Sequence, residues 1–107
     1  MTPDKHNGSP QFTPGPWMLD ERERAARIPY GGPHHTAFAY GGTVANARLI
    51  AAAPELYEAL EQANADAKLA ADSLGNSPPQ FRSVYDTFRI IEQRTGTALA
   101  KARGSND

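Results

Sequence analysis

Apolar residues recur three or four positions apart through the second half of the chain. One series is Leu56, Leu60, Ala63, Ala67, Ala70 and Leu74. A second series, apolar except for one threonine, is Phe81, Val84, Phe88, Ile91, Thr95, Ala98 and Ala102. This spacing is that of an α-helix with one apolar stripe. The region from about residue 44 to residue 103 is therefore predicted to form a packed helical hairpin.

Capping and helix-breaking residues mark where these helices begin and end. Thr43 is a suitable N-cap for a short helix that ends with a break at Ala53. Pro54 is tolerated best in the first turn of a helix, so we expect a new helix to open there. The pair at 75–76, Gly-Asn, supplies a stop, and the Ser-Pro-Pro segment at 77–79 restarts the chain as N-cap and first turn.

The two stripes also predict how the long helices face each other. In an antiparallel hairpin, Phe81 would lie beside Leu74 at the turn, and Ala98 would pass near Leu60 at the open end. Alanines in both stripes let the helices approach closely. Large residues would meet small ones at the open end, which leaves room for Trp17 or the sheet to cover it.

The first half of the chain has the pattern of short strands. Residues 17–19, 25–28 and 36–40 are the candidate strands, and the Gly-Gly-Pro segment at 31–33 is a strong turn signal between the last two. Alternation along the third segment places three larger side chains on one face: Thr36, Phe38 and Tyr40. A small antiparallel meander is the simplest arrangement.

Together these elements predict an α+β fold. We expect a small N-terminal antiparallel sheet of two or three strands, packed on a C-terminal two-helix hairpin with a short connecting helix. At 107 residues the chain suits a single domain, which we place at residues 14–104. Residues 1–13 have no periodicity, and we expect them and the end at 105–107 to be flexible.

The charge balance and composition argue against several classes of function. The chain has 11 Lys and Arg residues against 12 Asp and Glu, a net charge of −1. Nucleic acid binding is disfavoured because it needs a basic excess or a basic stripe. The chain has no cysteine, and none of its apolar runs approaches the roughly 20 residues of a membrane span. We expect a cytoplasmic protein that binds no cofactor or metal, and catalysis is disfavoured because no catalytic motif stands out.

Three segments of the chain resemble a widespread family of small phage and prophage proteins. They are TPGPW at 13–17, ANARLIAAAPEL at 45–56 and ALAKARG at 98–104. This resemblance implies an accessory gene of a phage or integrated element, and hence a protein made in a bacterial cell. Such genes often encode proteins that counter host defence, either by binding a defence protein or by sequestering a signalling nucleotide.

Two segments have the composition of ligand sites, but each favours a structural role. The Gly-Gly-Thr segment at 41–43 precedes a helix and could offer backbone N–H groups to a phosphate. A capped turn is favoured there, because the Lys-Ser/Thr pair of a phosphate-binding loop is missing. His34 and His35 are adjacent, and adjacent strand residues point to opposite faces, so a solvated loop is favoured over a metal site.

Six residues are the candidates for a ligand- or partner-binding site: Arg48, Arg82, Tyr85, Arg89, Tyr40 and Tyr57. Arg48 lies in the family motif, where it either grips an anionic partner or pairs with an acid such as Glu55 or Glu58. In the same motif, Asn46 is expected to order the start of the helix.

Two of these candidates, Arg82 and Arg89, are seven residues apart and share a helix face with Tyr85 nearby. Two guanidinium groups and a phenol could hold a phosphate or a nucleobase. The same side chains could instead form ordinary surface pairs with Asp86 or Glu92, which is the interpretation we favour.

Three functions follow as hypotheses. The one we favour is a phage accessory protein that counters host defence by binding a host protein through an exposed patch that uses Phe38, Tyr40 or Tyr57. The second is an oligomeric protein that sequesters a small anionic nucleotide signal at the arginines named above. The third is a structural or virion-associated protein, a homo-oligomer in which the alanine stripe serves self-assembly.

Overall fold

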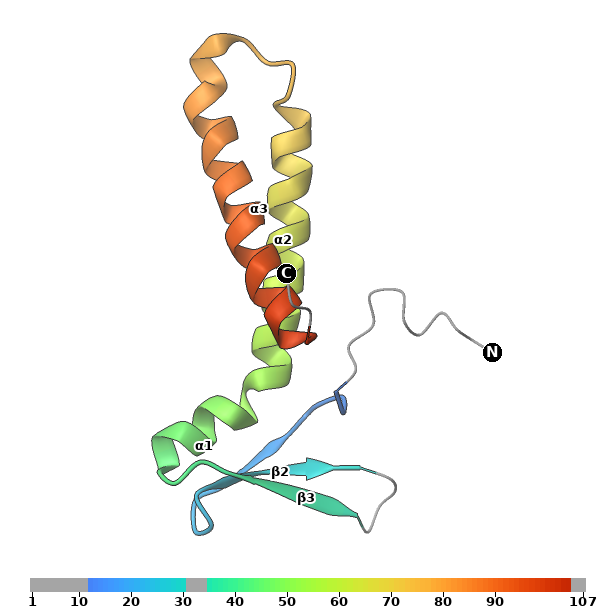
Figure 1. Cartoon of the computed structure of the whole chain (residues 1–107), viewed down its shortest axis with the longest axis vertical. Coiled ribbons are helices and arrows are strands. Elements are labelled where there is room, and N and C mark those ends of the chain that lie inside the picture. The colour runs from blue at the N-terminus through green and yellow to red at the C-terminus, as the bar shows by residue number, and fades with distance from the viewer. Residues whose placement is uncertain (1–11, 31–34, 105–107) are drawn as a thin grey trace, which may run out of the picture. The chain divides into compact units, whose positions relative to one another are not determined.

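The computed structural model describes residues 12–30 and 35–104 (Figure 1). Its elements in chain order are β1 (Met18–Asp20), β2 (Ala25–Pro29), β3 (Thr36–Tyr40), α1 (Val44–Ala51), α2 (Ala53–Ser73), the 3-10 turn η2 (Pro79–Phe81) and α3 (Arg82–Ala102). The predicted α+β class is confirmed, with a three-stranded antiparallel sheet followed by helices. The turn at 31–33, His34, the end at 105–107 and nearly all of the predicted tail lie outside the described residues.

Internal contacts divide the chain into two compact units. The N-terminal unit ends at Leu56 and holds the sheet, α1 and the start of α2. The C-terminal unit begins at Tyr57 and holds the rest of α2, η2 and α3. A single domain over 14–104, and the packing of Trp17 on the hairpin, stay predictions.

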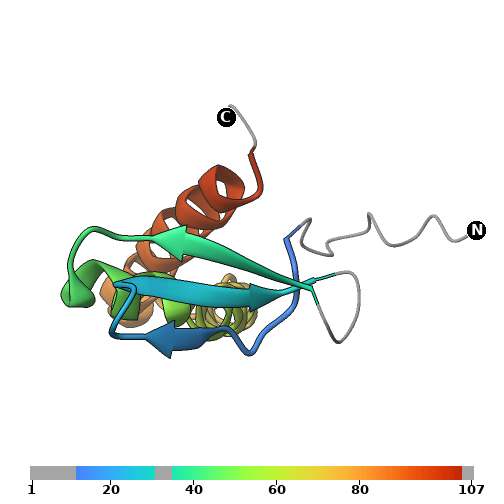
Figure 2. The ribbon, with the colours of Figure 1, turned by 90° about the horizontal axis from the view of Figure 1, so that it is seen from below.

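The sheet has the order β1-β2-β3, and its register decides which side chains share a face. Met18 pairs with Arg27, which pairs with Phe38, so these three residues lie on one face. The neighbouring row, Leu19, Ala26 and Ala39, lies on the other face. That inner face carries α1, which lies mainly against β2 (Figure 2). Ala26 and Ala47 are completely buried, and such small side chains let the helix sit close to the strands.

The start of α1 is ordered by the capping threonine and by Asn46 of the 45–56 segment. The Thr43 hydroxyl accepts a hydrogen bond from the Asn46 backbone N–H at 3.1 Å, and the Asn46 side-chain amide donates to the Gly41 carbonyl at 2.8 Å. The predicted N-cap and the structural role of Asn46 are both confirmed. The break between helices falls at Ala52, one residue earlier than expected, so Pro54 is the second residue of α2 and not the first.

Two of the three family segments meet within the N-terminal unit. A Cβ atom added to Gly15 would lie 2.8 Å from the Cβ atom of Pro54, which is closer than ordinary van der Waals contact. The indole N–H of Trp17 donates to the Thr13 carbonyl at 3.0 Å, and the ring packs edge-on against Phe12. Trp17 is thus partly buried within its own segment, and Gly15 occupies a position that admits no side chain.

Replacing Gly15 by alanine is expected to lower the free energy of unfolding by about 2 kcal/mol, because the backbone must move away from Pro54. Gly75→Ala is the matched control, since its Cβ atom would approach the Asp72 carbonyl only to 3.4 Å. Urea unfolding followed by circular dichroism measures both variants. Equal stability of the two would show that the 13–17 segment does not pack on Pro54 as described.

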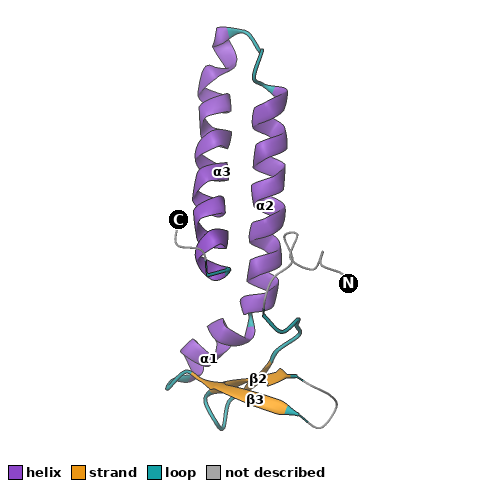
Figure 3. Cartoon of the chain, turned by 45° about the vertical axis from the view of Figure 1, so that its right-hand side comes forward, coloured by secondary structure: helices purple, strands orange, loops and turns teal. Residues whose placement is uncertain are grey.

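The hairpin is antiparallel, as predicted (Figure 3). Its interhelical seam follows the predicted stripes only in part, since Ala67 and Thr95 lie in it. On α2 the buried residues of this interhelical seam are Tyr57, Ala67 and Ala71, and on α3 the buried residue is Leu99. The predicted stripes are wrong at several positions by one residue. Ala63 and Ala98 are exposed, whereas their neighbours Asn64 and Leu99 lie in the seam. Phe81 and Leu74 do line one cavity at the turn, as expected.

Candidate functional site

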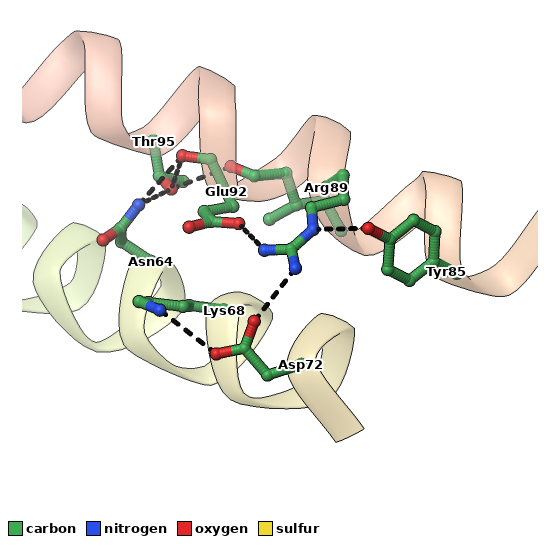
Figure 4. A network of polar contacts seen from close by, with 8 residues as sticks. Asn64, Lys68, Asp72, Tyr85, Arg89, Glu92 and Thr95 are labelled. Atoms are coloured by element: carbon green, nitrogen blue, oxygen red, sulfur yellow. Dashed lines mark hydrogen bonds and ion pairs between the residues drawn. The ribbon is translucent and has the colours of Figure 1, made fainter. Parts of the chain in front are cut away.

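Charged side chains of α2 and α3 form a network on one side of the seam (Figure 4). Arg89 donates to the Tyr85 hydroxyl at 3.1 Å, to Glu92 at 2.7 Å and across the hairpin to Asp72 at 2.9 Å. Lys68 donates to the other Asp72 oxygen at 3.1 Å. The hydrogen bonds from Lys68 and then Arg89 hold the pKa of Asp72 below its ordinary value of 3.8. Hydrogen bonds to Tyr85, Glu92 and Asp72 raise the pKa of Arg89.

This network gives Arg89 a structural role. All three nitrogens of its guanidinium group have partners within the hairpin, and two of those partners are carboxylates that already balance its charge. The predicted pair with Glu92 is confirmed. Arg82 also has its predicted partner, Asp86, at 3.4 Å, although both side chains are exposed and such a pair adds little stability.

The pH dependence of stability offers a test of the network. Because the pKa of Asp72 is lowered on folding, its stabilising effect is present above the ordinary pKa and is lost as the pH falls through the lowered value. We expect Asp72→Asn to remove part of the stability difference between pH 6 and pH about 2. Asp66→Asn is the control, since the Asp66 carboxylate accepts only a neutral amide, from Gln62. Urea unfolding at several pH values gives the free energy of unfolding as a function of pH. The curves for wild type and Asp66→Asn should run parallel, and the curve for Asp72→Asn should be flatter.

A second set of contacts closes the open end of the hairpin. Tyr57 is 5% exposed, and its hydroxyl accepts a hydrogen bond from Nε of Arg103. The same guanidinium group reaches Glu61 at 3.2 Å, and its carbon lies 5.6 Å from the centre of the Tyr57 ring. The bond to Tyr57 is the main cause that raises the pKa of Arg103. We therefore assign Tyr57, a candidate for partner binding, a structural role in the hairpin.

Asn64 joins the helices at the middle of the seam. Its side-chain amide donates to the Glu92 carbonyl at 2.9 Å and to the Thr95 hydroxyl at 3.0 Å. Gly96 passes close by, because an added Cβ atom would lie 3.4 Å from this amide nitrogen. The polar seam residues therefore fix the register of the two helices, a role that a search for apolar residues alone does not find.

A cavity of about 310 Å³ lies at the turn between α2 and α3. Its lining includes Phe81, Arg82 and Tyr85, together with the Ser-Pro-Pro segment at 77–79. Two of the six sequence candidates, Arg82 and Tyr85, thus share one cavity. Arg89 does not line it, but donates a hydrogen bond to the Tyr85 hydroxyl. An aromatic ring beside a guanidinium group can hold a small planar anion.

The outer face of the sheet carries exposed apolar side chains. Met18 is 58% exposed, Phe38 41% and Tyr40 65%, and Arg27 lies between Met18 and Phe38 in the register. The rings of Phe38 and Tyr40 stack with centroids 5.8 Å apart. Among the described elements of the N-terminal unit, none packs on this face (Figure 2). We call these four residues the aromatic sheet face. Sequence alternation identified Phe38 and Tyr40, but Met18 and Arg27 join them only through the strand register.

The remaining candidates lie apart from these groups. Arg48 is exposed on α1. Within the described N-terminal unit it forms no ion pair, and the predicted pair with Glu55 is therefore wrong. The pair with Glu58 stays a prediction. His35 packs its ring against Tyr30. Across residues 12–30 and 35–104, no group of three or more His, Asp or Glu side chains could hold a metal ion. In the same residues, no helix has the length and apolar character needed to cross a membrane.

Comparison with known families decides the origin of the chain. The sequence profile of the family described as Salmonella phage P22 protein Y8K6 matches residues 1–106. The chain belongs to this phage protein family. The predicted resemblance to small phage proteins is thereby confirmed at the level of the family. No curated protein and no solved structure matches the chain, so the Y8K6 family gives an origin and no activity.

Proposed function

We propose that this phage-family protein counters a host defence system by binding a host protein through the aromatic sheet face. The observation that carries the proposal is the exposure of Met18, Phe38 and Tyr40 together on one open face. Aromatic residues gathered on a rigid surface are typical centres of protein interfaces, since each buries a large apolar area at low entropic cost. The stacking of Phe38 on Tyr40 holds these two rings in place before a partner arrives.

Charge gives this face a second element of recognition. Arg27 lies between two apolar residues of the face, and a guanidinium group in that position can pair bidentately with a carboxylate of the partner. The favoured partner therefore has an apolar surface with an acidic residue near its centre. This function needs neither catalysis nor a cofactor, and we propose that the protein acts by binding alone, in the cytoplasm of the bacterial host.

The test is the plating of phage on bacteria that carry individual defence systems, with and without the protein. We expect wild type to restore phage plating on at least one such strain, and Phe38→Ser/Tyr40→Ser to lose the effect while staying folded. Arg82→Ala is the matched control, since it alters an exposed residue of the hairpin, and it should keep the effect. Full activity of the folded double variant would contradict the proposal.

The cavity at the hairpin turn supports a second candidate function, the sequestering of a small anionic nucleotide. Its volume of about 310 Å³ is at the lower end for a ligand pocket, and its lining pairs Arg82 with Phe81 and Tyr85. Thermal unfolding with a panel of cyclic and linear nucleotides tests it. A ligand at 100 times its dissociation constant should add about 2.7 kcal/mol of stability to wild type and none to Arg82→Ala. A flat panel would exclude this candidate and leave the first intact.

A further inference from the structure

The hairpin carries an apolar flank beside the seam between its own helices. On α2 this flank consists of Leu60, Ala63 and Ala70, and on α3 of Val84, Phe88, Ile91, Ala98 and Ala102. Ala63, Val84, Ala98 and Ala102 are exposed, and the others are half-buried. These residues belong to the stripes that the sequence pattern predicted as the seam. Their apolar spacing is real, and within the described hairpin four of them stay exposed.

Helix geometry places the α2 and α3 parts of this flank on the same side of the hairpin. Ala63 and Ala98 each precede a seam residue, Asn64 and Leu99, by one position, which is a rotation of about 100° about the helix axis. Because the helices are antiparallel, these two rotations turn toward the same side. The charged network agrees with this placement, since the ion pair between Arg89 and Asp72 lies on the side of the hairpin opposite the apolar flank. The hairpin therefore has one charged flank and one apolar flank.

We propose that the apolar flank binds the same flank of a second copy of this chain, forming an antiparallel four-helix bundle. The residue sizes favour a two-fold axis that crosses the hairpin near Ala67. Such an axis would lay Phe88 over the partner subunit's Ala98, and Val84 over the partner subunit's Ala102. On α3, large side chains then meet small ones across the axis, as a self-complementary two-fold interface requires.

The size of the apolar flank fits this occupant. At 1.5 Å per residue, the two helices share roughly 25 Å of length, and two helices side by side are roughly 20 Å wide. Each copy would bury about 500 Å², and the pair about 1,000 Å², which is the lower limit for a specific interface. No large side chain of the described core is completely buried, so a second copy would add apolar burial that the described chain lacks.

The mass of the full chain in solution, measured by sedimentation equilibrium over a wide concentration range, tests this proposal. We expect wild type to approach twice its 11.6 kDa mass as concentration rises. Ala98→Glu and Ala63→Glu place a charge on exposed positions of the flank and should each give a folded monomer. Gln93→Glu, an exposed residue outside the flank, should leave the dimer unchanged.

Three results would overturn the proposal. They are a wild type that stays monomeric at every concentration, a dimer that survives both glutamate variants, and a dimer that Gln93→Glu abolishes. If Ala98→Glu fails to fold by circular dichroism, Ala63→Glu decides alone. The inference uses the hairpin and not the aromatic sheet face, so its failure would leave the proposed function standing, and the failure of that function would leave the dimer standing.

Discussion

Replacing Tyr57 by alanine is expected to lower the free energy of unfolding by about 4 kcal/mol. The ring is 5% exposed, so its removal leaves a cavity in the packed hairpin. The hydroxyl is also a partner of Arg103, whose guanidinium group would keep Glu61 but lose this acceptor and the ring beside it. For a domain of this size, the midpoint of thermal unfolding should fall by roughly 15 °C or more.

The conservative variant separates the ring from its hydroxyl. Tyr57→Phe keeps the buried ring and removes the hydroxyl that accepts from Arg103, so a loss of about 1 kcal/mol is expected. Urea unfolding at neutral pH measures both variants. If Tyr57 were instead a partner-binding residue, alanine would leave stability almost unchanged and reduce only binding. That result would refute the structural role assigned to it.

Leu99→Ala is the second large expected effect, at about 3 kcal/mol. Leu99 is 3% exposed and is the largest aliphatic side chain among the buried residues of the described core. It lies in the seam opposite a helix rich in alanine, which cannot extend a side chain into the space that Leu99 would vacate. The free energy of unfolding obtained from urea titration should show the full loss.

Ile90→Ala is the matched control for Leu99, because Ile90 lies on the same helix but is 45% exposed. Its expected loss is below about 1 kcal/mol, since much of the side chain already contacts water. Equal losses for the two variants would show that the seam does not run through Leu99. A loss at Ile90 larger than that at Leu99 would place the interior of the hairpin on the other face of α3.

Sequence reasoning identified the elements of this fold because local signals mark them strongly. The helical period, the capping threonine at 43 and the stop near Gly75 each act within a few residues. The same is true of the alternation in β3, which placed Phe38 and Tyr40 on one face. These features depend on backbone geometry near each residue, so no knowledge of distant contacts was needed.

The seam could not be predicted in the same way, because polar residues share it. Tyr57 and Asn64 contribute to the contact between helices through hydrogen bonds of their side chains, and an apolar count assigns them to the solvent. At Ala63 and Ala98 the count instead followed the apolar flank, one residue away from the seam. A hairpin with two usable faces gives two stripes, and hydrophobic spacing alone does not say which one closes the monomer.

The candidate sites also divide into contacts that local spacing predicts and contacts that depend on long-range register. Arg89 and Glu92 could be paired from the sequence because they are one helical turn apart, whereas the bond from Arg89 to Asp72 depends on the register of the hairpin. The aromatic sheet face likewise required the strand register, which alone brings Met18 and Arg27 beside Phe38. Long-range register is the information that local patterns lack.

The most direct test of the proposed function is photo-cross-linking in bacteria whose defence system the protein counters. A photoreactive phenylalanine derivative replaces Tyr40 on the aromatic sheet face in one variant, and Gln93 on the hairpin in another. We predict that position 40 yields an adduct with one host protein, that position 93 yields none with it, and that the adduct protein is a component of the countered defence system. An adduct with that component from position 93 and none from position 40 would contradict the account.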